Sequence, residues 1–480
     1  MRVTFLSLLI IILLPFYTFC QSSKATITSV MKNLDSKTET YGDIAHQIWE
    51  WAELGYLEVK STQLLQDHLK SEGFKVTNGV AEIPTAFIAE YGSGEPVIGI
   101  LAEFDALPGI SQQAIPEKKA VEEGGSGHAC GHHLFGAGSV AAAVAVKNWL
   151  KETKTKGTVR LYGTPAEEGG AGKVYMVRGG LFDDADAVLH WHPSSGNAAS
   201  AASSLSNKSG KFRFYGNAAH AAASPERGRS ALDAVEAMNF MVNMQREHVP
   251  SDSRTHYVIT SGGEAPNVVP AYAEVYYYVR HPEMAQVRKN FEWVVKAAEG
   301  AALGTGTRME YEVIHGLYNV MPNEPLQEVM YKNLQLVGGV KYDAKERAFA
   351  KKIIPTLGKE GVKPEDAEII SPYTVSYKGR GGSTDVGDIS WVVPTAGLRT
   401  ATWVPGTGAH SWQAVAAGGT SIGTKGMMVA AKTIALTAID IYQNPSVCKK
   451  AKDALIERTG KDFKYLPLLG DRKPPLDYRK

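Results

Sequence analysis

Residues 96–105 read Pro-Val-Ile-Gly-Ile-Leu-Ala-Glu-Phe-Asp, an apolar run of strand length that ends in two carboxylates. Such a run is typical of a strand buried on both faces of a sheet. Short apolar runs recur at 158–162 and 187–189, and helical patterns cover 40–72 and the Ala- and Val-rich segment 133–150. This alternation of strands and helices predicts a doubly wound α/β sheet.

Polar side chains lie just beyond the carboxyl ends of these three predicted strands. They are, in chain order, Asp105, Glu167, Glu168, His190 and His192. In open α/β sheets, ligands bind at the carboxyl ends of the strands. We therefore expect these side chains to meet at one rim of the sheet and to form a single site.

Residues 127–133 read Gly-His-Ala-Cys-Gly-His-His and concentrate thiol and imidazole groups in a short turn. Cys130 and His132 are ligands that zinc prefers, and the glycines allow the backbone to turn tightly. A structural zinc knuckle would use repeated Cys pairs and would not need the adjacent carboxylates Glu167 and Glu168. The combination therefore favours a metallohydrolase.

The chain has 480 residues with 44% hydrophobic residues, so it can bury a large core, and the length suits two or three domains. Its formal net charge of +1 gives no support for a nucleic-acid partner. The three cysteines, at 20, 130 and 448, are too few for a disulfide framework. Cys130 is better explained as a metal-bound thiolate.

The pattern changes to alternating strands and an amphipathic helix in residues 206–318. We interpret this segment as an α+β domain inserted into a catalytic domain made of residues 25–205 and 319–445. Residues 446–480 are rich in Lys and Pro and are expected to form a solvated tail.

Residues 1–20 carry the pattern of a targeting segment. Arg2 precedes an apolar run from Val3 to Leu14, and a polar segment begins at Gln21. This pattern predicts a signal peptide and export to the periplasm or the extracellular space. An uncleaved membrane anchor at the N-terminus is the alternative.

Five motifs in one order resemble the M20 metallopeptidase and amidohydrolase family, and within it the group of aminobenzoyl-glutamate hydrolase B subunits. The motifs occupy residues 99–109, 127–132, 165–170, 262–269 and 383–388. The resemblance implies a zinc-peptidase-like catalytic domain with an inserted α+β lid domain through which two chains dimerise. It leaves open whether a partner subunit is needed.

The resemblance also implies a set of functional residues. Two divalent metal ions, zinc or manganese, would be held by Cys130, His132, Glu168, His192 and His410. Glu167 would be the general base for a metal-activated water, Asp105 would orient a ligand, and His220 would stabilise the oxyanion. Asn267 and Arg280 would bind the substrate.

Four neighbouring polar residues have a different expected status. His128 and His133 are expected to support the site rather than to bind metal. Asp385 is expected to be a turn residue, with a place on the substrate side as the alternative, and the role of Glu103 stays open. The expected reaction is hydrolysis of an amide between an acyl or aroyl group and an amino acid, as in p-aminobenzoyl-glutamate. Alternatives are a dipeptidase for unusual dipeptides, such as β-alanyl ones, and a non-catalytic binding protein on the same scaffold.

Overall fold

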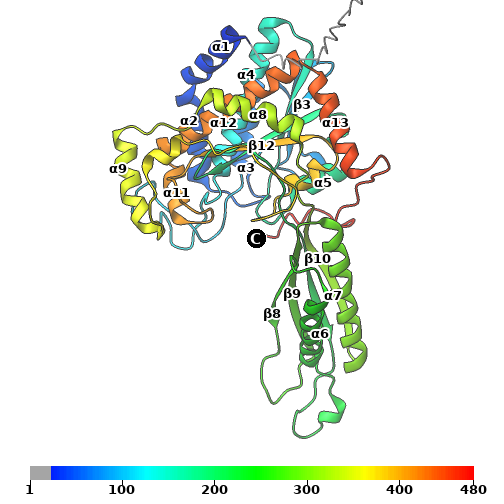
Figure 1. The fold of residues 1–480 in the computed structure, drawn as a ribbon. Helices are drawn as coiled ribbons and strands as arrows, with labels where there is room; N and C mark the ends of the chain where they lie inside the picture. Colours follow the sequence, from blue (N-terminus) through cyan, green and yellow to red (C-terminus); the bar gives the residue numbers. More distant parts are fainter. Residues whose placement is uncertain (1–22, 480) are drawn as a thin grey trace, which may run out of the picture.

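The computed structural model describes residues 23–479, which form a large α/β domain and a narrow second domain that projects from it (Figure 1). The predicted targeting segment, residues 1–20, lies outside the described residues. The helices are α1 (Lys24–Ser36), α2 (Thr38–Trp51), α3 (Val59–Ser71), α4 (His132–Thr153), α5 (Gly172–Arg178), α6 (Ala231–Gln245), α7 (Met284–Thr305), α8 (Glu324–Val337), α9 (Ala344–Ile353), α10 (Val386–Ser390), α11 (Trp412–Gly418), α12 (Ser421–Gln443) and α13 (Ser446–Thr459). The strands are β1 (Lys75–Asn78), β2 (Phe87–Ser93), β3 (Val97–Ala102), β4 (Gly157–Gly163), β5 (Ala187–Ser194), β6 (Ala201–Ala202), β7 (Ser206–Tyr215), β8 (Arg254–Ser261), β9 (Tyr272–His281), β10 (Arg308–Leu317), β11 (Val375–Ser376) and β12 (Thr395–Ala401).

A six-stranded mixed sheet forms the centre of the large domain. Its strand order is β1-β2-β4-β3-β5-β12, and β2 pairs antiparallel with both of its neighbours. The other pairings are parallel, so β3, β4, β5 and β12 end at the same edge. The predicted α/β class is confirmed, and the runs at 96–102, 158–162 and 187–189 are the strands β3, β4 and β5.

Strand β5 is longer than its apolar run predicts. Its backbone pairing with β12 continues to Ser194, so His190 and His192 lie within the strand and share one face. The parallel register sets Gly397 beside His190 and Arg399 beside His192. A Cβ at Gly397 would overlap the His190 imidazole, so glycine there makes room for the ring.

Helices α4 and α12 form the core of the large domain, packing on each other and on β5. A Cβ at Gly138 would lie 2.8 Å from Met427 and 2.9 Å from Trp191, so glycine permits this close approach. Among the described helices, α12 is long and apolar enough to cross a membrane, but 83% of its most apolar window is buried inside the protein. It therefore serves as a core helix of the α/β domain.

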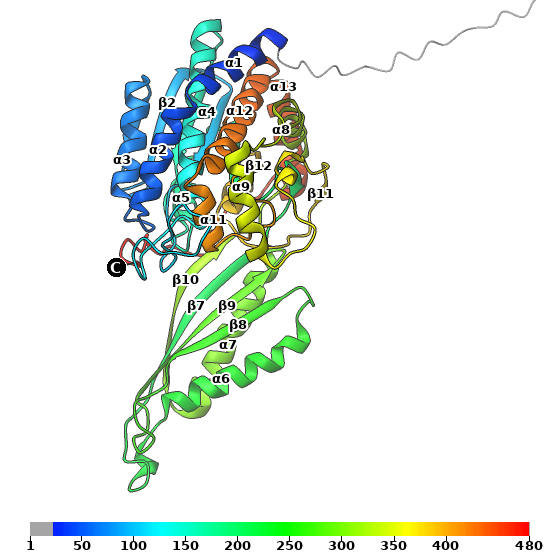
Figure 2. The ribbon, with the colours of Figure 1, turned by 90° about the vertical axis from the view of Figure 1, so that its left-hand side faces the viewer.

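The second domain, here called the lid, is an antiparallel sheet of order β10-β7-β9-β8 covered on one face by α6 and α7 (Figure 2). It has its own core, which includes Phe212, Val275 and Phe291. Strand β7 pairs with β9 from Ser206, opposite His281, to Tyr215, opposite Tyr272. The Ser206–His281 pair lies at the end of the lid sheet that joins the large domain.

The expectation of a solvated tail after residue 445 is wrong. Residues 446–459 form helix α13, in which Val447 and Cys448 are buried. Beyond this helix, Leu468 is 1% exposed and Leu469 is 4% exposed. The segment has many Lys and Pro residues and few apolar ones, so its composition did not predict that these few apolar side chains pack against the rest of the protein.

Candidate active site

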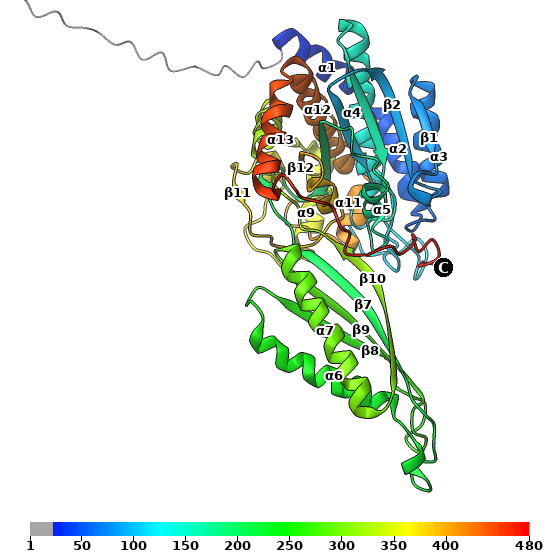
Figure 3. The same cartoon turned by 90° about the vertical axis from the view of Figure 1, so that its right-hand side faces the viewer.

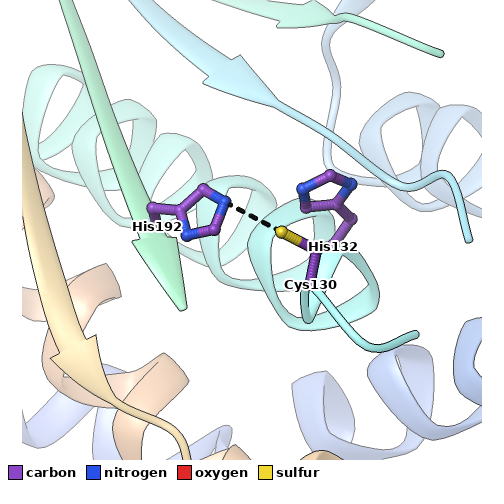
Figure 4. Close-up of side chains that lie close together, drawn as sticks. All are labelled: Cys130, His132 and His192. Atoms are coloured by element: carbon purple, nitrogen blue, oxygen red, sulfur yellow. Dashed lines mark hydrogen bonds between the residues drawn. The ribbon is translucent and has the colours of Figure 1, made fainter. Parts of the chain in front are cut away.

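Cys130 and His132 are placed by the turn that precedes α4, with His132 as the first residue of that helix. Gly131 between them has φ +80°, and a Cβ there would lie 2.6 Å from Pro193 at the end of β5. Glycine therefore allows the turn to approach the strand. Nε2 of His192 lies 3.4 Å from Cys130 Sγ, and the ligand atoms of these two residues and His132 all lie within 4.8 Å (Figure 4).

A second group of candidate ligands shares the same thiol. Atoms of Cys130, Glu168 and His410 lie within 4.8 Å of one another, and His410 Nε2 is 3.2 Å from Glu168 Oε1. The backbone N–H of His410 donates to Ala129 O at 2.9 Å, which brings this distant loop to the Cys130 turn. His410 has φ +59°, a strained conformation for a residue with a side chain. The structure thus brings all five predicted metal ligands together.

Two of the imidazoles are oriented by hydrogen bonds from their Nδ1 atoms. Nδ1–H of His132 donates to Asp105 Oδ1 at 2.9 Å, and Nδ1–H of His192 donates to Pro193 O at 2.7 Å. This orientation leaves Nε2 of both rings facing the cluster, where it is placed to bind a metal ion. Burial and the charges of His132 and Arg399 lower the pKa of His192 well below its usual range, which keeps this ring neutral and able to bind metal.

The donor set fits divalent cations. His132 Nε2 and Glu168 Oε1 are buried and form no hydrogen bond of normal geometry with a described residue, although Glu103 and His410 lie 3.1 and 3.2 Å from them. A buried polar atom without a partner is costly, and a cation would satisfy both. Burial also raises the pKa of the Cys130 thiol, so a neighbouring cation would be needed to hold the thiolate.

Glu167 and Glu168 lie in a loop after β4, and their side chains face different groups. Glu168 faces His410, whereas a Glu167 oxygen lies within 4.8 Å of Glu103 and His132. Burial and the nearby Glu168 charge raise the pKa of the Glu167 carboxyl well above its usual range. A carboxylate with a raised pKa beside the metal ligands has the properties of a general base.

A buried ion network adjoins the site, and its cation was not expected from the sequence. Lys173 Nζ lies 2.7 Å from Glu103 Oε1 and 2.7 Å from Asp385 Oδ1, and all three side chains are at most 1% exposed. Asp385 lies in a turn before α10, as expected, and its side chain is in addition an ion-pair partner of Lys173. The other oxygen of Glu103 lies 3.1 Å from His132 Nε2. The signal in the sequence was a single Lys in the otherwise uncharged run 169–177.

The predicted lid residues lie apart from the metal ligands, and Arg280 also lies apart from the other two. His220 and Asn267 are exposed and adjacent, because Ala221 N–H donates to Asn267 O and His220 pairs with Val268. Both loops lie beyond the end of β7 remote from the large domain (Figure 2). A ten-residue strand spans roughly 33 Å, so these residues are far from the cluster in their own chain. Arg280 lies at the opposite end of the lid sheet, with its guanidinium 5.3 Å from the Tyr278 ring centre.

The flanking histidines bind backbone carbonyls. A hydrogen bond of 3.0 Å joins His128 Nε2 to Ile48 O, and one of 3.1 Å joins His133 Nε2 to Gly418 O. The two rings also pack against each other with centroids 4.8 Å apart. These contacts anchor the turn that carries Cys130, and they leave neither ring directed at the metal ligands.

A model of peptidase family M20/M25/M40 matches residues 99–369, more than half of the chain. The chain belongs to peptidase family M20. The family inferred from the five motifs is thereby confirmed, and this M20 chain is a hydrolase that acts on amide bonds.

Known M20 proteins resemble the chain over most of its length. It is 42% identical to the B subunit of p-aminobenzoyl-glutamate hydrolase from Escherichia coli over 444 residues, which cover 87% of this chain and 92% of that protein. It is 31% identical to Xaa-Arg dipeptidase of Mus musculus over 448 residues, or 90% and 91% of the two chains. The crystal structure of a dinuclear metal-binding M20 peptidase from Bacillus subtilis has a TM-score of 0.55 at 19% identity, and the match covers 88% of this chain and 99% of that one. The M20 fold therefore extends through both domains described above.

Proposed function

We propose that this enzyme hydrolyses the amide bond of N-acyl or N-aroyl amino acids of the p-aminobenzoyl-glutamate type, with two divalent metal ions, zinc or manganese. The observation that carries the proposal is the pair of ligand groups that share Cys130, with Glu167 beside them. Sulfur favours zinc, whereas the carboxylate and imidazole ligands also suit manganese. The 42% identical relative named for p-aminobenzoyl-glutamate supports the substrate class.

The residues divide the chemistry between them. When bound, two divalent cations polarise the amide carbonyl and acidify water. Glu167 takes a proton from the attacking water and returns it to the leaving nitrogen. Asp105 keeps His132 in the tautomer that presents Nε2, and the same carboxylate accepts from Glu168 N–H at 2.8 Å.

A free guanidinium at the rim suits a substrate that carries a carboxylate. Arg399 is exposed, and its backbone is in register with that of His192 on the neighbouring strand. The backbones of neighbouring strands lie about 4.8 Å apart. The Arg399 side chain makes no hydrogen bond or ion pair with any residue between 23 and 479. Sequence reasoning assigned this role to Arg280 and did not single out Arg399.

The proposed enzyme is a homodimer joined through the lid. The edge strand β8 exposes Tyr257, Val258 and Ile259, and α6 exposes Phe240 and Met244. An exposed apolar edge strand favours pairing with another chain. Dimerisation would allow His220 and Asn267 to serve the partner's active site. A monomer in light scattering would contradict this arrangement.

Export and a heteromeric partner are further parts of the proposal. The N-terminal pattern supports export with cleavage near residue 20, against an uncleaved anchor, and N-terminal sequencing of the mature protein distinguishes the two. The Escherichia coli relative is by name one of the subunits of its hydrolase, which supports a second kind of chain. Co-purification with a partner encoded in the same organism would test this requirement.

The decisive experiment is p-aminobenzoyl-glutamate hydrolysis by the purified chain, first stripped of metal and then supplied with manganese or zinc. Release of glutamate that depends on metal and is lost in Glu167→Gln would support the proposal. The second candidate is a dipeptidase, favoured by the 31% identity to Xaa-Arg dipeptidase, and a panel of Xaa-Arg and β-alanyl dipeptides tests it. Metal binding without hydrolysis of any substrate would favour a binding protein.

A further inference from the structure

The loop that carries Glu167 and Glu168 has a strained backbone. Ala166 has φ +58° and Ala171 also has φ +58°, both in the left-handed region that residues with side chains rarely adopt. A residue in this strained conformation persists only where its surroundings hold it. The ends of this loop therefore depend on contacts from outside it.

Those contacts come from side chains that bind the backbone of the loop. Glu58 accepts from Ala166 N–H at 2.8 Å, and the Tyr56 hydroxyl donates to Gly170 O at 2.7 Å. The carbonyl oxygen of Glu168 also accepts hydrogen bonds, from two residues that follow it by more than three hundred positions in the chain. Tyr478 O–H donates to this oxygen at 3.2 Å, and Arg479 Nη2 donates to it at 2.6 Å.

Residues 460–479, here called the strap, carry Tyr478 and Arg479 across the junction of the two domains (Figure 3). Leu468 is buried in the core of the lid, and the next residue, Leu469, is buried in the core of the large domain. Arg472 Nη1 donates to Val313 O at 3.0 Å and also to Ile314 O, at the irregularity in β10. The strap is thus bound to both domains at their junction before it reaches the loop that carries Glu167 and Glu168.

The end of the strap fits closely against the loop. The Tyr478 ring packs edge-on against Tyr56 with centroids 5.6 Å apart. A Cβ at Gly55 would overlap the Tyr478 hydroxyl and would lie 2.9 Å from Ala166 Cβ, so glycine leaves room for the strap beside the loop. Gly169, with φ +97°, turns the loop where Tyr478 lies 3.6 Å from the position of a Cβ.

We propose that Tyr478 and Arg479 are positioning residues of the active site, which hold the Glu168 carbonyl and so direct the Glu168 carboxylate at the metal site. The inference rests on the proposed role of Glu168 as a metal ligand. Groups that orient metal ligands typically contribute tenfold to a hundredfold in metal affinity or activity. Because the strap also packs in the lid core, it connects the position of the lid to this loop.

The test compares Tyr478→Phe/Arg479→Ala with Lys473→Ala, a change in the same strap at a side chain that is 85% exposed. We expect the double variant to bind zinc or manganese at least tenfold more weakly, with kcat lowered at least tenfold and KM changed less than twofold. In the metal-free protein, peptides covering residues 164–172 should exchange amide hydrogens faster. Tyr478→Phe/Arg479→Lys, which restores one donor, should recover most of the metal affinity.

Metal affinity, kcat and hydrogen exchange within twofold of the parent would overturn the inference. So would equal losses in Lys473→Ala, because a general loss of stability would then explain them. Glu168→Gln separates this inference from the proposed function on which it rests. If that variant loses metal while the strap variants do not, only the inference fails. If Glu168→Gln keeps its full metal content, the proposed ligand role fails first.

Discussion

Asp388 is a buried carboxyl whose proton should make stability depend on pH. It is 0% exposed, and it accepts from Tyr465 O–H at 2.8 Å and from Tyr318 N–H at 3.0 Å. Burial raises its pKa from 3.8 to about 7, and the nearby Asp385 charge adds to the shift. The folded protein therefore keeps this proton over a pH range in which the unfolded chain has lost it.

The sign and the magnitude follow from that shift. Because the folded-state pKa is the higher one, the free energy of unfolding falls as pH rises from about 4 to about 7. A shift from 3.8 to about 7 is roughly three units at about 1.4 kcal/mol each, so the full loss is about 4 kcal/mol. About 2 kcal/mol of this loss in the free energy of unfolding falls between pH 5.5 and pH 8.

Asp388→Asn should remove this dependence, since an amide has nearly the shape of the protonated acid: its oxygen can accept from Tyr318 N–H, and its NH2 group can donate to the Tyr465 hydroxyl. Urea unfolding of the metal-free protein at pH 5.5 and 8 measures the effect. Relative to the parent, the variant should gain about 2 kcal/mol between the two pH values. The exposed Asp453 in α13 offers the control Asp453→Asn, which should follow the parent. Parallel profiles for the parent and Asp388→Asn would refute the reasoning.

Three further predictions concern the site itself. Glu167→Gln should lower kcat by a factor of about 10² to 10⁴ and leave the metal content measured by elemental analysis unchanged, because it removes the base and no ligand. Cys130→Ala should lower the occupancy of both metal positions, since both candidate ligand groups share this thiol, and loss of only one ion would contradict a shared ligand. Lys173→Met leaves Glu103 and Asp385 buried without their cation and should destabilise the fold by about 3–5 kcal/mol in denaturant unfolding. A change below about 1 kcal/mol would show that water or protonation compensates for the missing cation.

The metal-ligand set illustrates how far the sequence carries the prediction. Cys130, His132 and Glu168 stand in short motifs whose residue types and spacing already indicate metal chemistry, and the family resemblance supplied His192 and His410. The rim of the sheet could also be anticipated, because apolar runs end at polar residues there. The exact length of β5 could not, since its last residues are held by pairing with β12 rather than by their own pattern.

The sequence by itself determined the fold class, the family and the residue types of the metal site, because these depend on local patterns and on the order in which the motifs occur along the chain. Only the tertiary structure decided which distant groups support that site. The partners of Lys173 and Asp385 and the role of the strap residues Tyr478 and Arg479 could not be read from local patterns, since they arise from contacts between segments far apart in the chain. The separation of His220 from the metal ligands is likewise a matter of tertiary structure, because the lid strands set the distance between them.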